Sequence, residues 1–182
     1  MASGNNARCL ATLPTLARYL EVGISASDWY AKANESIQAY AHKHGLPVGL
    51  VADVLALVSP RKTVPDSVRI ARHYFDTGKL IDVVSSVRAQ FSHWQETGII
   101  RGPKCHAFAR ALLGDGSALV VDTWIMQALN APISSMGKKW VLAAAERRFQ
   151  RLADITGLRV AETQAAVWCG AQGGRCAYLE IN

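Results

Sequence analysis

The sequence predicts an all-α protein, and three observations support this fold class. Apolar residues recur at the spacing of one helix face in nearly every segment of the chain. These segments are separated by glycines, prolines and short polar turns, which begin and end helices. Half of the 182 residues are apolar and 19% are charged, so the chain can form a sizeable core and is not disordered throughout.

The first part of the chain predicts three helices. The first runs over residues 7–20 and is interrupted or restarted near Pro14. Ser27 is a suitable N-cap for the second, which continues to residue 44. Residues 46–58 are apolar on almost all sides. Such a short segment could be a buried strand, but its alanines and leucines favour a central helix.

The remaining segments continue the helical pattern. We expect helices over residues 66–75, 79–95, 104–113, 123–129, 138–155 and 160–169, with an irregular tail over 170–182. A glycine-containing turn leads into the helix that starts at residue 104, and a short extended piece over 118–121 precedes Asp122. Asp122 stands at the N-cap position of the next helix.

Basic residues are concentrated in the middle of the chain. The formal net charge is +6 and the sequence pI is about 9.4. Between Arg61 and Arg110 there are nine basic residues and four acidic ones. A local excess of this size is typical of proteins that bind a polyanion, although many basic proteins bind none.

The cysteine pattern and the N-terminus indicate a soluble, cytoplasmic protein. Cys9, Cys105, Cys169 and Cys176 include no C-x-x-C pair and do not have the spacing of a zinc or iron–sulfur site. We expect reduced thiols. The first residues are polar and do not resemble a signal peptide, and no apolar run reaches the ~18 residues of a membrane span.

Lys104 and Asp122 are the candidate catalytic residues. The turn Gly102-Pro103 places Lys104 in the first turn of a helix, where the helix dipole disfavours the ammonium form. A neutral lysine can act as an amine nucleophile. Eighteen residues later, Asp122 would lie beside backbone N–H groups that keep it ionised. An ionised carboxylate can oppose a positive charge that develops on a substrate.

This stretch resembles the helix-hairpin-helix DNA glycosylase superfamily, which contains endonuclease III and the 8-oxoguanine glycosylases. Gly102-Pro103-Lys104 and Val121-Asp122-Thr123 match the two specific motifs of that superfamily, and Leu57 to Lys62 resembles the segment that feeds its DNA-facing wedge loop. The likeness covers residues 47–170 and is specific over 104–123.

The sequence also departs from the family pattern. Ile100 stands in place of the first hairpin glycine, and Trp124 stands where a histidine is common. The segment over 59–122 is shorter than in well-known members, and the four-cysteine cluster of the iron–sulfur members is absent. The chain is therefore similar to a short, divergent member, such as one encoded by a phage.

The resemblance implies a two-lobed helical bundle of the helix-hairpin-helix DNA glycosylase type within a single compact unit, 1–182. One lobe, 47–129, would carry the hairpin and the Lys/Asp site. Residues 1–46 and 130–182 would form the second lobe.

The resemblance also implies an activity, a DNA glycosylase with AP-lyase activity in base-excision repair. The substrate would be DNA, with a damaged or modified base flipped out of the duplex and removed. Lys104 would attack C1′ and form a Schiff base, and Asp122 would stabilise the sugar cation. Arg61, Lys62, Arg101 and Gly102 would contact DNA, and Trp124 is a candidate for the base pocket.

No organic cofactor, metal, membrane or obligate protein partner is implied. A monovalent cation held by the hairpin carbonyls is compatible with the family pattern.

Simpler interpretations remain open at this point. Lys104 could be a solvated first-turn lysine, Asp122 an ordinary N-cap, and residues 59–62 a plain basic loop. The main competing function is a non-enzymatic helix-hairpin-helix module that binds DNA or a protein. A third is a phage enzyme of base hypermodification that uses the same Lys/Asp site.

Overall fold

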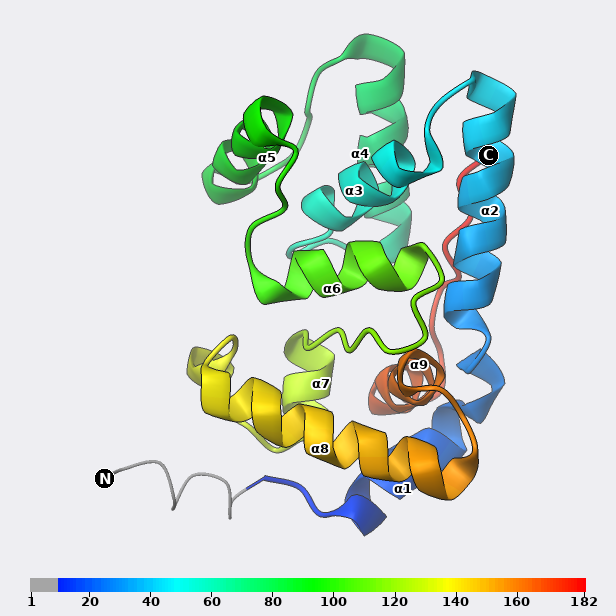
Figure 1. Cartoon of the computed structure of the whole chain (residues 1–182), viewed down its shortest axis with the longest axis vertical. Coiled ribbons are helices and arrows are strands. Elements are labelled where there is room, and N and C mark those ends of the chain that lie inside the picture. The colour runs from blue at the N-terminus through cyan, green and yellow to red at the C-terminus, as the bar shows by residue number, and fades with distance from the viewer. Residues whose placement is uncertain (1–9) are drawn as a thin grey trace. The chain divides into compact units, whose positions relative to one another are not determined.

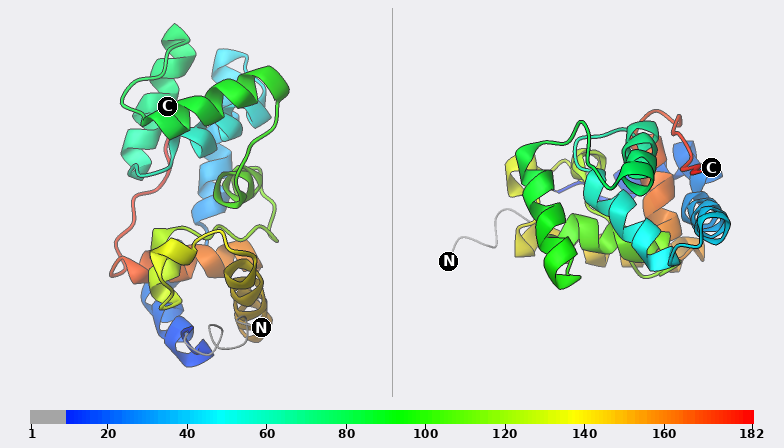
Figure 2. Two further views of the ribbon diagram at one scale, coloured as in Figure 1. Left: turned by 90° about the vertical axis from the view of Figure 1, so that its left-hand side faces the viewer. Right: turned by 90° about the horizontal axis from the view of Figure 1, so that it is seen from above.

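The computed structural model describes residues 10–182, and within that range the chain is built from helices joined by loops (Figures 1 and 2). This confirms the all-α class. The helices in chain order are α1 (Leu13–Gly23), η2 (Ile24–Ala26), α2 (Trp29–His44), α3 (Val48–Val58), α4 (Val64–Thr77), α5 (Ser85–Thr97), α6 (Pro103–Leu112), α7 (Thr123–Ala128), η3 (Ile133–Ser135), α8 (Lys139–Thr156) and α9 (Val160–Ala171). Residues 7–9 of the expected first helix, with Cys9, lie outside the described residues. Within the described range, none of the helices combines the length and apolarity needed to cross a membrane.

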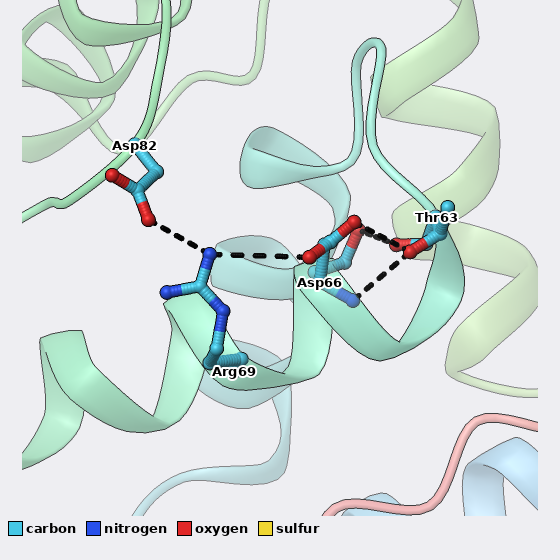
Figure 3. A network of polar contacts seen from close by, with 5 residues as sticks. Thr63, Asp66, Arg69 and Asp82 are labelled. Atoms are coloured by element: carbon cyan, nitrogen blue, oxygen red, sulfur yellow. Dashed lines mark hydrogen bonds and ion pairs between the residues drawn. The ribbon is translucent and has the colours of Figure 1, made fainter.

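The main difference from the expected helices lies before α5, which begins at Ser85 rather than at residue 79. Asp82 has a φ of +52°, in the left-handed region, and therefore interrupts a helix at this point. Its carboxylate accepts a hydrogen bond from Arg69 Nη2 of α4 at 2.8 Å (Figure 3). Arg69 Nη2 also lies 3.9 Å from Asp66 Oδ1. The Asp66 carboxylate accepts a hydrogen bond from the hydroxyl of the N-cap residue Thr63. The contact between Arg69 and Asp82 thus outweighs the apolar spacing that predicted a helix from residue 79.

The chain forms two compact units. Among the described residues, unit 1 contains 10–30 together with Asp115–Cys176, and unit 2 contains Ala31–Gly114 together with Ala177–Asn182. These boundaries differ from the expected lobes, because most of α2 belongs with α3 to α6, and α7 belongs with α8 and α9. The reason for the second change is burial: Ile125 and Met126 of α7 are fully buried in the same hydrophobic core as Phe149 of α8 and Val167 of α9.

Unit 1 is organised around the crossing of α1 and α9. The two helices approach so closely that a Cβ on Gly170 would lie 1.8 Å from the carbonyl oxygen of Tyr19, and one on Gly23 would lie 2.0 Å from that of Ala166. Helices α7 and α8 complete the core against α9. This unit therefore depends on close backbone packing.

Unit 2 is organised around α3, which lies among α4, α5 and α6 (Figure 1). Seven of its residues are fully buried: Val51, Ala52, Val54, Leu55, Ala56, Leu57 and Val58. The expected central helix over 46–58 is confirmed. The irregular C-terminal segment runs along α2, where the backbone N–H of Ile181 donates to Ser36 Oγ at 2.8 Å.

Candidate functional site

The hairpin between α5 and α6 brings Lys104 to the first turn of α6. Helix α5 ends at Thr97, five residues follow, and α6 begins at Pro103. Gly102 has a φ of +84° and a ψ of 135°, a conformation that residues with a Cβ rarely adopt. The side chain of Gln90 on α5 donates a hydrogen bond to the carbonyl of Arg101 and so fastens the hairpin to the preceding helix. The local unit is a helix, a short glycine-containing hairpin and a second helix.

The side chain of Lys104 contacts the end of α3. Its Nζ donates a hydrogen bond to Ser59 Oγ and lies 5.2 Å from the centroid of the Phe108 ring. The Ser59 hydroxyl in turn donates to the carbonyl of Ala56 at 2.8 Å. Lys104 is partly buried, so its nitrogen is held near the surface of unit 2 by contacts from two helices.

The contact with Ser59 places the predicted basic loop beside the hairpin. Residues 59–62 form a tight turn, closed by a hydrogen bond from Lys62 N to the carbonyl of Ser59 at 3.2 Å. Arg61 is exposed and has a φ of +60°, which is unusual for a residue other than glycine. Arg61 and Lys62 thus lie on a loop that adjoins Gly102 and Lys104, at the start of α6. These are four of the predicted DNA-contact and catalytic residues. Arg101, which precedes Gly102, is also exposed.

Asp53 is a polar residue of this unit that sequence reasoning did not select. Its Oδ2 accepts a hydrogen bond from Trp94 Nε1 at 3.0 Å, which joins α3 to α5. Burial raises the pKa of Asp53, while the Trp94 hydrogen bond and the charge of His106 lower it. The signal in the sequence was one carboxylate within an otherwise apolar helix, a position where a charge requires a partner.

Asp122 in unit 1 is held by two hydrogen bonds. One oxygen accepts from the backbone N–H of Ile125 at 2.9 Å, which confirms Asp122 as the N-cap of α7. The other oxygen accepts from Trp168 Nε1 on α9 at 3.0 Å. The carboxylate is only partly buried. Its plane is therefore fixed by groups from two helices while part of the side chain remains accessible.

The Trp168 indole that binds this carboxylate belongs to a cluster of aromatic rings. The rings of Trp29 and Trp168 meet edge to face, with centroids 5.7 Å apart. Tyr30 is buried, and its hydroxyl donates a hydrogen bond to Gln164 Oε1 at 2.6 Å. Burial, followed by the negative charge of Asp122, raises the pKa of Tyr30 well above its usual value. A negatively charged Asp122 that accepts from the Trp168 indole, near the neutral Tyr30, is suited to oppose a positive charge on a bound group.

Trp124, the candidate for the base pocket, lies on the surface of α7. Its side chain is 39% exposed, whereas the next two residues of the helix, Ile125 and Met126, face the core. The indole is thus available for stacking. Sequence reasoning missed Trp168 and Tyr30 as neighbours of Asp122, because they come from segments far away in the chain.

The two candidate catalytic residues belong to different compact units, Lys104 to unit 2 and Asp122 to unit 1. Across residues 10–182, no three His, Cys, Asp or Glu side chains are grouped as they would be around a metal ion.

The fold and site define an all-α protein with a lysine in the first turn of α6, after a short glycine-containing loop, and an aspartate that caps α7 and accepts a hydrogen bond from Trp168. The chain matches a family of unknown function (DUF7178) over residues 23–175 and belongs to it. No curated protein and no solved structure shows a significant match to the chain.

Proposed function

We propose that this protein is a DNA base-excision glycosylase with AP-lyase activity, of the helix-hairpin-helix type. One observation carries the proposal: the hairpin between α5 and α6 places Lys104 in the first turn of α6, against Ser59 and the basic loop that follows it. The sequence resemblance at Gly102-Pro103-Lys104 and Val121-Asp122-Thr123 supports the same interpretation.

DNA binding would begin with the phosphates. Arg61, Lys62 and Arg101 supply positive charge on the two adjoining loops, and the N-terminus of α6 supplies backbone N–H groups beside Gly102. Contacts of this kind fix the position of a duplex without reading its sequence. A flipped base would then stack on an exposed aromatic ring, for which Trp124 is the candidate.

The chemistry would use the amine of Lys104 and the charge of Asp122. As the bond between base and C1′ breaks, its electron pair leaves with the base and positive charge develops on the sugar. Asp122, oriented by Ile125 and Trp168, opposes this charge. The neutral amine of Lys104 forms a new bond to C1′, and opening of the sugar ring gives a Schiff base. Loss of a proton from C2′ then expels the 3′ phosphate and cleaves the strand.

Borohydride trapping on an abasic-site duplex tests the proposal, because this substrate does not require knowledge of the target base. Reduction of the Schiff base should give a covalent protein–DNA adduct with the wild-type chain. Lys104→Ala should abolish the adduct, whereas Lys79→Ala, which removes an exposed lysine outside the two loops, should leave it unchanged. Asp122→Asn should reduce adduct formation far more than DNA affinity. Binding without any adduct would overturn the lyase proposal.

A non-enzymatic DNA-binding module is the second candidate, and one observation favours it. Lys104 and Asp122 both have structural partners, Ser59 for the lysine and the amide of Ile125 for the aspartate. Both residues could thus serve the fold alone. In that case the protein would bind duplex DNA with a steep salt dependence, Arg61→Asn together with Lys62→Ala would flatten this dependence, and no substrate would give a trapped adduct.

A further inference from the structure

The hydroxyl of Ser59 gives its proton to the backbone of α3. In a continuing helix the carbonyl of Ala56 would accept from the backbone N–H of residue 60, but this residue is proline and has none. Ala56 is fully buried, so water does not replace the missing donor, and an unpaired carbonyl would be costly. Ser59 Oγ donates to this carbonyl instead, at 2.8 Å.

This bond decides the direction of the hydrogen bond between Ser59 and Lys104. A hydroxyl has one proton and two lone pairs. Because the proton goes to Ala56, the Ser59 oxygen accepts from Lys104 Nζ. The same direction argues against a serine nucleophile activated by the lysine, because such a serine would have to give its proton to the amine.

We propose that Ser59 is a positioning residue, which holds the amine of Lys104 by one N–H and leaves its lone pair to attack C1′ of the sugar. The inference rests on the function proposed above for Lys104. A neutral amine has two N–H groups and one lone pair, and the bond to C1′ uses the lone pair. An acceptor does not compete for that lone pair, whereas a hydroxyl that donated would occupy it.

The Ser59 oxygen is fixed relative to the helix that carries the lysine. Ser59 follows three fully buried residues of α3 (56–58), and α6 packs against α3. On α6 itself, the ring of Phe108 lies one turn after Lys104, with its centroid 5.2 Å from Nζ. A lysine side chain is flexible, so the loss of the oxygen should displace the amine although both helices remain in place.

Borohydride trapping on the abasic-site duplex measures the positioning. Ser59→Ala should lower the rate of adduct formation about tenfold, because a displaced amine seldom reaches the sugar. Ser59→Thr keeps a hydroxyl and should trap nearly as fast as the wild type. Ser86→Ala, which removes an exposed hydroxyl at the start of α5, is the matched control and should have no effect.

A second variant separates the lysine contact from the stability of α3, because Ser59→Ala also leaves the Ala56 carbonyl without its donor. Pro60→Ala returns a backbone N–H to residue 60. The double variant, Ser59→Ala with Pro60→Ala, therefore supplies the carbonyl but not the lysine. It should unfold at a urea concentration similar to the wild type, and still trap about tenfold more slowly.

The free protein provides a readout that a purely structural role would not change. The ¹³C shift of Lys104 Cε, followed against pH in lysine-labelled protein and assigned with Lys104→Arg, reports the pKa of the amine. A neutral oxygen acceptor stabilises the ammonium more than the amine, so its removal in Ser59→Ala should lower this pKa by about half a unit to one unit. The variant would then hold more neutral amine and yet trap more slowly, which misplacement of the amine explains.

Comparison of the variants cancels the effect of the other charged groups on these elements, which all of them retain: Asp53, Arg61, Lys62, Arg101, His106 and Arg110. Adduct formation at the wild-type rate by both Ser59→Ala and the double variant would overturn the role of Ser59 and leave the lyase proposal in place. An unchanged Lys104 pKa in these variants would overturn the hydrogen bond on which the role depends. A wild-type chain that binds the duplex without any adduct would instead overturn the lyase proposal, and the role of Ser59 with it.

Discussion

The α1–α9 crossing in unit 1 and the α5–α6 hairpin in unit 2 both depend on glycine, but for opposite reasons. At the crossing, Gly170 is required for space, since a Cβ would overlap backbone atoms of Tyr19. At the hairpin, a Cβ on Gly102 would meet nothing within 4 Å, and the φ of +84° is what requires glycine. Close packing fixes the first region and backbone conformation fixes the second.

This difference extends to the two candidate catalytic residues. Asp122 is held by an amide of its own helix and by an indole from α9, so its loss should affect the stability of the protein. The amine of Lys104 is at the end of a long side chain and donates to the Ser59 hydroxyl. When the lysine is removed, this hydroxyl keeps its own hydrogen bond to the carbonyl of Ala56. Removal of the aspartate would therefore leave a neighbouring indole without its acceptor, whereas removal of the lysine leaves its partner hydroxyl bonded.

Gly170→Ala should have the largest effect. The new Cβ would lie 1.8 Å from the Tyr19 carbonyl oxygen, and two helix backbones would have to separate. We expect a loss of more than about 3 kcal/mol in the free energy of unfolding, measured by urea denaturation. Gly49→Ala on α3 is the control: a Cβ there has open space, and alanine favours a helix by up to about 1 kcal/mol. Equal midpoints for the two variants would refute the close crossing.

Asp122→Ala should destabilise the protein by about 2 kcal/mol. The substitution removes the N-cap of α7, worth about 1 kcal/mol, and leaves the indole N–H of Trp168 without this acceptor, at a cost of at least about 1 kcal/mol. Lys104→Ala should change stability by less than about 0.5 kcal/mol. Urea denaturation of both variants checks the contrast. A lysine variant that is the less stable of the two would reverse the comparison.

Gly102→Ala should cost about 1–2 kcal/mol, because alanine strains the backbone at a φ of +84°. It should also displace Lys104 and lower borohydride trapping about tenfold. Gly45→Ala, at a φ of +64° with open space around it, is the matched control. It should lose similar stability, yet trap as the wild type does. Equal trapping by both variants would show that the hairpin does not position the lysine.

Asp53→Asn should have the smallest effect and the clearest pH dependence. Burial raises the pKa of folded Asp53 above that of the unfolded chain, so folding favours the protonated form, and stability is lost as the pH rises through these two pKa values. The asparagine variant should therefore be more stable than wild type at neutral pH, by less than about 1 kcal/mol because solvent screens a partly exposed group. The gain should vanish at about pH 3.

Asp66→Asn should instead make the protein less stable than wild type at neutral pH, since the hydrogen bond from Thr63 lowers the pKa of Asp66. Thermal unfolding of both variants at the two pH values checks the prediction. A less stable Asp53→Asn at neutral pH would mean that the Asp53 charge is stabilised by its neighbours rather than penalised by burial.

Local signals were sufficient for most helices. The apolar run before Ser59 predicted the buried α3, and Asp122 was recognised as a cap because an N-cap depends on residues within one turn. The start of α5 was missed, since the ion pair between Arg69 and Asp82 joins residues that local spacing cannot relate. The two units divide the chain at other positions than the lobes implied by the resemblance, because burial of α7 against α9 depends on packing across more than thirty residues of sequence.

The sequence by itself determined the all-α class, the hairpin that precedes Lys104 and the cap formed by Asp122, because periodicity, glycine conformation and capping are all local properties. Only the tertiary structure decided that Ser59 contacts Lys104 and that Trp168 holds Asp122. Such contacts depend on which helix faces pack together, and burial of apolar surface, which has no direction, selects those faces only when the whole chain is folded.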